Sequence, residues 1–119
     1  MITVRITGLN KLQGFLGKFL KSLDREIARA IRRSAFILEA KTKPLVPVDT
    51  GLLRRQTRPW EITPTFALIE SRTDYAIFVH EGTRGRKGRP YLLQGAKKSE
   101  RAIEIEFENA IKRAINKSK

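Results

Sequence analysis

The spacing of apolar residues divides the chain into an N-terminal strand, two long helices and a β-rich middle. Ile2, Val4 and Ile6 alternate with polar residues, a period of two that predicts a half-buried strand ending at Gly8. Apolar residues three and four positions apart then predict a long amphipathic helix, whose other face is rich in Lys and Arg. The apolar positions of this helix are Leu9, Leu12, Leu16, Phe19, Leu20, Leu23, Ile27, Ile31, Ala35 and Leu38.

We expect this first helix to end before Pro44, because the residue that precedes a proline avoids the helical region of backbone space. Ser22 or Asp24 is suited to cap a second start, so a bend near Leu23 is compatible with the pattern. We interpret the whole stretch as one long helix.

A loop and a β-hairpin are predicted next. Residues 44–51, with the sequence PLVPVDTG, form the loop, and Asp49 or Thr50 is expected to cap a short helical turn through Leu53–Gln56. Residues 57–63 and 66–73 carry β-forming side chains on either side of Pro64-Thr65, which predicts two antiparallel strands.

The region before the second long helix is short and basic. We expect an apolar element at Ala76–His80, followed by a flexible, solvated loop at Gly82–Gly88 with the sequence GTRGRKG. Pro90 suits the first turn of a helix, which has no need of its missing N–H. The apolar positions that predict this helix are Leu93, Ala96, Ile103, Phe107, Ala110, Ile111 and Ala114.

The predicted fold class is therefore α+β, with two long amphipathic helices packed on a small, mainly antiparallel sheet. The length of 119 residues suits one domain, which we place over residues 1–119. The apolar stripes of both helices supply its core.

Charge is the largest departure from an average composition. The chain has 25 Lys and Arg against 12 Asp and Glu, a net charge of +13, and residues 1–58 hold 13 of the basic groups against 4 acidic ones. Such a field attracts polyanions or an acidic protein surface. Four arginines on the first helix form a candidate nucleic-acid face, but no aromatic residues are interleaved for base stacking, which favours a solvated helix face. They are Arg25, Arg29, Arg32 and Arg33.

Several classes of site are excluded by composition. The absence of Cys and the single histidine, His80, exclude disulfides, thiolate metal sites and multi-His zinc sites. No metal is therefore expected. The basic loop lacks the spacing of a phosphate-binding loop, so no nucleotide or other cofactor is expected either. The sequence has no apolar run of about 20 residues and no secretion signal at its start, so we expect no membrane contact and assembly in the cytoplasm.

Asp49-Thr50-Gly51 matches the short signature of aspartic proteases, which need two carboxylates that share a proton. The basic helix before it and Pro47 on its approach favour a structural turn instead, in which Gly51 lets the backbone bend. A hydrolase centred on Asp49 is the least favoured alternative. His80 lacks a nucleophile and an orienting partner, so a structural role is favoured and no enzyme is predicted.

Three segments occur in an order typical of one protein family. They are Val46–Arg54 (VPVDTGLLR), Tyr75–Thr83 (YAIFVHEGT) and Arg89–Leu93 (RPYLL), the first after a long basic helix and the last at the start of a helix. This pattern resembles the tail-completion and head–tail joining family of long-tailed double-stranded DNA phages. Gly95 stands where a proline often occurs in that family.

The resemblance implies a non-enzymatic structural protein of the virion tail and neck, assembled in the host cytoplasm. It implies a homo-oligomeric ring, typically of six copies, at the head-proximal end of the tail. The implied partners are the tail-tube protein and a head-closure or connector protein, with DNA passing through the lumen. A basic nucleic-acid-binding module is the alternative that the charge of +13 favours.

The resemblance also implies roles for individual residues. The loop between Thr83 and Pro90 is more basic than the family's pattern, and from its charge we expect its cations to line a lumen through which DNA passes or to meet an acidic rim on the neighbouring ring; they are Arg84, Arg86, Lys87 and Arg89. The residues that would form the adjoining turn and interface are Asp49, Thr50, Gly51, Arg54, Tyr75, Glu81, Gly82 and Thr83. Trp60, Tyr75 and Tyr91 are expected to be core or interface anchors.

Overall fold

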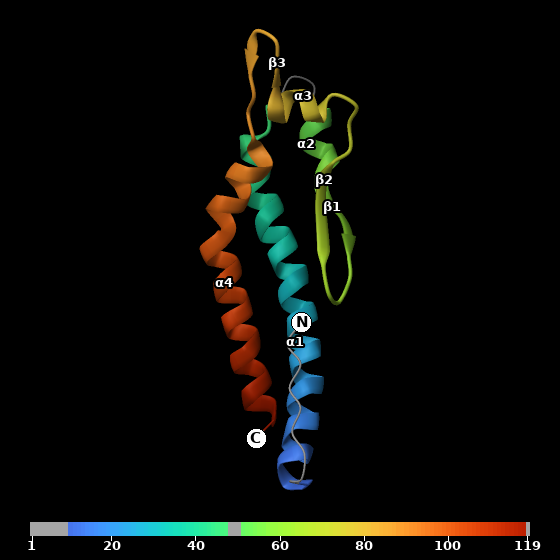
Figure 1. The fold of residues 1–119 in the computed structure, drawn as a ribbon, viewed down its shortest axis with the longest axis vertical. Coiled ribbons are helices and arrows are strands. Elements are labelled where there is room, and N and C mark those ends of the chain that lie inside the picture. Colours follow the sequence, from blue (N-terminus) through green and yellow to red (C-terminus); the bar gives the residue numbers. More distant parts are fainter. Residues whose placement is uncertain (1–9, 48–50, 119) are drawn as a thin grey trace.

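Two long antiparallel helices lie side by side and form a rod, with a β-hairpin against one of them (Figure 1). The structure is a computed structural model that describes residues 10–47 and 51–118. Helix α1 spans Asn10–Thr42 and helix α4 spans Tyr91–Ser118. The molecule measures 65 × 21 × 20 Å. The predicted α+β class is confirmed, while the strand expected at residues 2–6 lies outside the described residues.

The end of α1 confirms the prediction drawn from Pro44. The α-helix ends at Thr42 and continues as a 3-10 turn, η1, at Lys43–Leu45. Helix α1 also runs through residues 22–24 without interruption, so no second start occurs there. Helix α2 then spans Leu52–Gln56. Its N-cap is Gly51, and Asp49 and Thr50, which were expected to cap it, lie outside the described residues.

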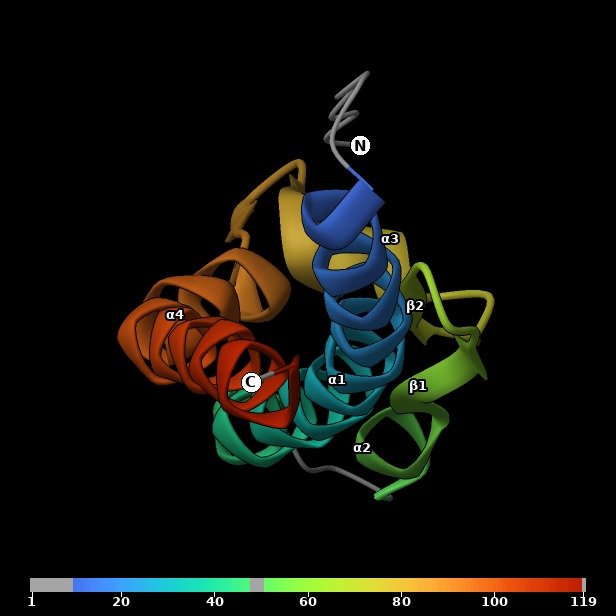
Figure 2. The ribbon, with the colours of Figure 1, turned by 90° about the horizontal axis from the view of Figure 1, so that it is seen from below.

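The predicted hairpin is confirmed. Strand β1, Thr57–Ile62, pairs antiparallel with strand β2, Ala67–Ser71, and the hairpin packs against α1 (Figure 2). The register shifts between Pro59 and Glu61, which places Trp60 in a β-bulge.

Trp60 anchors this hairpin. Its indole Nε1–H donates to the carbonyl oxygens of Gln56 and Glu70, at 3.0 Å and 3.1 Å. The guanidinium carbons of Arg58 and Arg72 lie 3.9 Å and 4.4 Å from the ring centroid, in positions suited to cation–π contact. Trp60 therefore stabilises the β1–β2 hairpin, which agrees with its expected role as an anchor.

Residues 76–87 contain more secondary structure than the sequence predicted. Helix α3 spans Ala76–Glu81, and strands β3, Gly82–Thr83, and β4, Arg86–Lys87, form a second antiparallel hairpin. The sequence analysis expected a loop over Gly82–Gly88 and did not predict this hairpin, whereas the exposure of residues 83–87 agrees with the expected solvated segment. Gly85, in the turn between the two strands, has φ +81°, a left-handed conformation that glycine adopts without steric cost.

Small residues form the seam between α1 and α4. Leu93 is 60% exposed, and Ala96 is also exposed, so the stripe expected at the start of α4 was wrong. We call the buried residues of the two helices other than Glu26 and Tyr91 the seam. They are Ala30, Ser34, Ala35 and Thr42 of α1, with Gly95, Ser99, Ala110, Ala114 and Ser118 of α4.

The rod exposes more surface than a compact protein of its mass. Its accessible surface is 8830 Å², whereas the scaling for folded monomers gives about 6,600 Å². Its radius of gyration is 19.1 Å, against about 13.5 Å for a compact chain of this length. No helix in the described part of the chain is long and apolar enough to cross a membrane.

Candidate functional site

The three motif segments meet at one end of the rod, which we call the tip; it comprises residues 46–47, 51–54 and 75–93 (Figure 1). The tip has its own core. Val46 and Leu53 come from the first segment, Ala76 from the second and Tyr91 from the third, and these four buried residues form one cluster. Each segment therefore supplies apolar side chains to this core.

A chain of hydroxyl groups holds the tip to the first hairpin. Tyr91 Oη donates to Ser71 Oγ at 2.8 Å, Ser71 Oγ lies 2.7 Å from Thr57 Oγ1, and Thr57 Oγ1 donates to the carbonyl oxygen of Leu53 at 2.7 Å. A carbonyl oxygen only accepts, so the hydrogen of Thr57 is committed to Leu53. Ser71 must therefore donate to Thr57. Each of the three hydroxyl groups thus donates one hydrogen bond, from Tyr91 to Ser71, from Ser71 to Thr57 and from Thr57 to the carbonyl oxygen of Leu53.

Removal of the hydroxyl that starts this chain tests its contribution to stability. We expect Tyr91→Phe to lower the free energy of unfolding by about 1–2 kcal/mol, because Ser71 loses its donor in a partly buried site. Tyr75→Phe is the matched control and should change stability by less than about 0.5 kcal/mol, since Tyr75 is exposed. Urea unfolding followed by circular dichroism measures both, and equal losses would contradict the hydroxyl chain.

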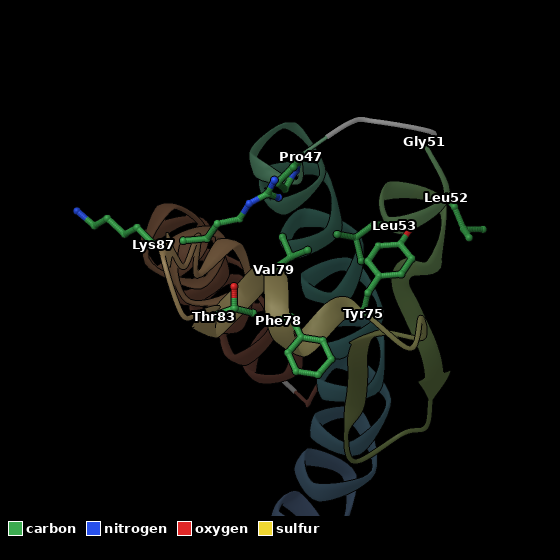
Figure 3. Close-up of a pocket in the computed structure, with 10 residues that line it drawn as sticks. Pro47, Gly51, Leu52, Leu53, Tyr75, Phe78, Val79, Thr83 and Lys87 are labelled. Carbon is green, nitrogen blue, oxygen red and sulfur yellow. The ribbon is translucent and has the colours of Figure 1, made fainter.

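A hollow of about 630 Å³ opens at the tip (Figure 3). Aromatic and aliphatic side chains line it, and Phe78 and Tyr75 are 58% and 40% exposed. Arg86 and Lys87 of β4 stand at the same hollow. The remaining lining residues are Pro47, Gly51, Leu52, Leu53, Val79 and Thr83.

The second hairpin carries the cations that the sequence singled out. Arg84, Arg86, Lys87 and Arg89 are all exposed, and none of them forms an ion pair with another residue of the described ranges. The base of the hairpin is closely packed. A Cβ on Gly88 would lie 2.5 Å from the carbonyl carbon of Glu81, so only glycine fits there. This packing fixes the position of the hairpin that carries the cations.

The structure brings together only part of the predicted interface. Gly51, Tyr75 and Thr83 line the hollow beside Arg86 and Lys87. The other predicted residues do not line it: Gly82 is in strand β3, Arg84 and Arg89 lie at or beside the second hairpin, and Arg54 is part-buried in α2 with its Nε unpaired. Asp49 and Thr50 lie outside the described residues.

His80 and Glu81 form a local pair. The Glu81 carboxylate only accepts, so His80 Nδ1, 2.7 Å from Glu81 Oε1, carries the hydrogen. The imidazole also packs edge-on against Tyr91, with ring centroids 5.2 Å apart. These contacts fit the predicted structural role of His80. In the described ranges, no group of three or more His, Cys, Asp or Glu residues is arranged to hold a metal ion.

Sequence reasoning missed the exposed apolar residues of α3. Ile77 and Phe78 are both well exposed, whereas Ala76 beside them is buried. The signal was available, because a six-residue helix cannot bury adjacent Ile and Phe side chains against a single neighbour. Together with the hollow, these side chains give the tip an apolar surface.

Sequence reasoning also missed Glu26, a buried carboxylate far from the tip. Lys117 Nζ and Arg113 Nε donate to its two oxygens at 2.6 Å and 2.7 Å, and Arg29 lies 3.8 Å away. The hydrogen bonds from Lys117 and Arg113 lower the pKa of Glu26 from 4.5 to about 2, against the opposing effect of burial. This carboxylate joins α1 to the end of α4.

The tip thus combines an apolar hollow, exposed aromatic side chains and unpaired cations. Comparison with protein-family models, with curated proteins and with solved structures finds no match for this chain. The chemistry of the tip suits a partner surface that offers both carboxylates and apolar side chains.

Proposed function

We propose that this chain is a structural subunit of a ring that completes a phage tail and joins it to the head connector. The observation that carries the proposal is the convergence of the three family-like segments at the tip. Residues 46–54 and 89–93 are far apart in the chain, yet they share one buried cluster with residues 75–83. Segments that build one surface are expected to act together in one interface.

The shape of the rod supports a role as a subunit. The accessible surface exceeds that of a compact monomer by about 2,200 Å², the difference between 8830 Å² and about 6,600 Å². Stable interfaces bury roughly 1,200–2,000 Å² in total, so this surface is sufficient for contact with neighbouring copies. A heterologous contact between identical copies closes into a ring when its rotation closes.

The tip is the part of the subunit that would meet the next ring. Its cations suit an acidic rim on a connector or tail-tube protein, and its hollow suits an apolar side chain from that rim. Long-range attraction by the cations would speed the encounter, while the apolar contact would slow dissociation.

The test is assembly with and without partners. We expect negative-stain images and light scattering to show closed rings, typically of six copies, in the presence of the tail-tube and connector proteins. Arg84→Gln with Arg86→Gln should leave the ring intact and weaken docking to the connector about tenfold or more. Lys97→Gln with Lys98→Gln removes the same charge from α4 and should leave docking unchanged. Monomers alone, with or without partners, would refute the proposal.

A nucleic-acid-binding module is the second candidate, favoured by the unpaired cations of the second hairpin. It predicts tight binding to duplex DNA with a slope of about −0.9 for each phosphate contact in a plot of log K against log salt. Fluorescence anisotropy at several salt concentrations measures this slope. If the double variant Arg84→Gln with Arg86→Gln binds DNA with the same affinity as the unaltered chain, the second hairpin is not the DNA-binding surface.

A further inference from the structure

The hollow at the tip has an apolar side and a cationic side. Helices α2 and α3 supply large apolar side chains, whereas strand β4 supplies Arg86 and Lys87. Figure 3 shows Leu53 and Tyr75 on one side of the hollow and Lys87 at its opposite edge. The apolar residues that the two helices contribute are Leu52, Leu53, Tyr75, Phe78 and Val79. A chain that crosses the hollow therefore meets apolar side chains at one end and cations at the other.

The positive charge of the hollow is not neutralised by its own lining. Arg86 and Lys87 line it, and no carboxylate of the described residues does. Glu81, at the end of α3, instead accepts a hydrogen bond from His80. Asp74 directly precedes the tip in the sequence and does not line the hollow. The remaining charged residues of the tip are Arg54, Arg84 and Arg89. The hollow therefore attracts carboxylates from another molecule.

Backbone contacts hold the cationic side against the apolar side. The Arg89 N–H donates to the carbonyl oxygen of Val79 at 2.9 Å, which joins the end of the second hairpin to α3. A Cβ on Gly82 would lie 2.6 Å from the backbone nitrogen of Gly88, so the two ends of this hairpin are closely packed. Both sides of the hollow are thus in place in the chain alone, and such preorganisation lowers the cost of binding.

The size of the hollow suits more than one side chain. Its volume of about 630 Å³ lies within the range of roughly 300–1,000 Å³ that is typical of sites enclosing most of a ligand. Tyr75 and Phe78 expose aromatic surface at this site, and aromatic residues are enriched where proteins bind one another. An extended segment with several consecutive side chains in the hollow would cover this surface.

We propose that the hollow binds an extended segment of a partner protein in which a large apolar residue lies close in sequence to acidic residues. This inference rests on the proposed docking of the tip to the next ring, and it names the chemistry of the segment that docks. The apolar side chain lies between α2 and α3, and the carboxylates face Arg86 and Lys87. The separation of the two sides fixes the direction in which the segment crosses the hollow.

A peptide suits the hollow better than single-stranded nucleic acid does. Sites for single strands stack successive bases on aromatic rings along a basic groove. Among the described lining residues only Tyr75 and Phe78 are aromatic, and the rest of the apolar lining is aliphatic. Phosphates would pair with the cations but would not cover the aliphatic side chains. A segment with both apolar and acidic residues satisfies both sides.

Selection from a random peptide library tests this chemistry. A displayed library of dodecapeptides is selected on the purified full-length chain, which requires neither a ring nor a partner. We expect the enriched peptides to carry Phe, Trp, Leu or Ile within about three positions of Asp or Glu. Enriched peptides that lack acidic residues, or a chain that selects no peptide, would overturn the inference.

Variants on the apolar side locate the bound peptide. Phe78→Ser should raise the dissociation constant of a selected, fluorescently labelled peptide about tenfold or more, as measured by fluorescence anisotropy. Its circular dichroism spectrum should be unchanged, because Phe78 is exposed. Leu93→Ser is the matched control, since Leu93 is also exposed but does not line the hollow, and it should change the constant less than about twofold. Equal effects of the two variants would place the peptide elsewhere and overturn the inference.

A double-mutant cycle tests the cationic side. Arg86→Gln with Lys87→Gln in the chain, or amides in place of the acidic residues of the peptide, should each raise the dissociation constant about tenfold. The two changes combined should cost little more than either alone, because both remove the same interaction. Lys97→Gln with Lys98→Gln removes the same charge from α4 and should change the constant less than about twofold. Fully additive losses would show that the carboxylates do not face β4.

The outcomes separate this inference from the proposed ring. An oligothymidine dodecamer is the competing probe; if it binds more tightly than the selected peptides and Phe78→Ser weakens it, the hollow is a nucleic-acid site and the inference is overturned. If the peptides bind as expected but the chain stays monomeric with its partners, the chemistry of the hollow stands and the ring is wrong. If rings form and dock while Phe78→Ser leaves peptide binding unchanged, the ring stands and this inference is wrong.

Discussion

Replacing Gly95 with alanine is expected to lower the free energy of unfolding by about 2–3 kcal/mol. A Cβ at this position would overlap Thr42 Oγ1 and would lie 2.9 Å from Thr42 Cβ and 3.0 Å from Thr42 Cα. Thr42 is fully buried, and two of these three atoms belong to parts of the residue that cannot rotate away. The α-helices must therefore separate at this point, which exposes part of the seam to water.

Two further variants make this prediction specific. Gly17→Ala in α1 is the matched control, because nothing lies within 4 Å of its added Cβ, and it should raise stability by about 0.5–1 kcal/mol. Thr42→Ala combined with Gly95→Ala should recover much of the loss, since it removes the overlapping hydroxyl, which is buried without a hydrogen-bond partner. Chemical unfolding measures all three. A Gly95→Ala protein as stable as the unaltered chain would mean that the helices are not this close.

Neutralising Glu26 is expected to lower the free energy of unfolding by about 2–3 kcal/mol at neutral pH. Glu26→Gln keeps the shape of the side chain but replaces a carboxylate that accepts from both Arg113 and Lys117. Those two cations are partly exposed and can turn to water, which keeps the cost below that of a fully buried ion pair. Glu61→Gln, at an exposed position, is the control and should change stability by less than about 0.5 kcal/mol.

The same carboxylate makes stability depend on pH. The pKa of Glu26 is about 2 in the folded chain and near its ordinary value of 4.5 in the unfolded chain. Its contribution is therefore complete above about pH 5 and is lost as the pH falls toward 2, because protons bind the unfolded state first. By pH 3 the loss should be on the order of 2 kcal/mol.

A comparison of two proteins isolates this effect from the other carboxylates. Free energies of unfolding at pH 6 and pH 3 should differ more for the unaltered chain than for Glu26→Gln, because the variant has nothing to protonate at this position. The repulsion from the net charge, +13 in the unaltered chain and one unit more in the variant at neutral pH, is nearly the same in both proteins and contributes little to the comparison. Identical pH dependences would show that Glu26 is not held as a carboxylate between the two cations.

The sequence was sufficient to predict the two long helices and the first hairpin. Long periodic segments identified both helices, and Pro44 located the end of α1 to within a residue or two. The first hairpin followed from β-forming residues around Pro64-Thr65. These features depend on interactions between residues that are close together in the sequence.

The faces of the helices could not be predicted in the same way. The apolar pattern favoured large side chains such as Leu93 as buried positions, but closely packed helices leave room only for small ones such as Gly95 and Ser99. Small residues carry little hydrophobic signal. Glu26 was missed for a related reason, since its partners lie 87 and 91 residues away and a lone carboxylate on a basic helix is usually solvated.

The candidate site was predicted in part. The family-like segments identified the tip, including Tyr75, and the basic composition of residues 84–89 identified the cations of the second hairpin. The order of that hairpin was missed, because each strand has only two residues and its sequence, rich in Gly and Arg, is typical of loops. The hollow depends on how three distant segments meet, which no local pattern contains.

The position of Trp60 gives the molecule a built-in optical probe. It is the single tryptophan of the chain, and its indole is fixed in the β1–β2 hairpin between two guanidinium groups, away from the seam between α1 and α4. Its fluorescence therefore reports on the hairpin, whereas far-ultraviolet circular dichroism is dominated by the two long helices. Melting curves recorded with the two signals would coincide only if hairpin and helices come apart in one cooperative step.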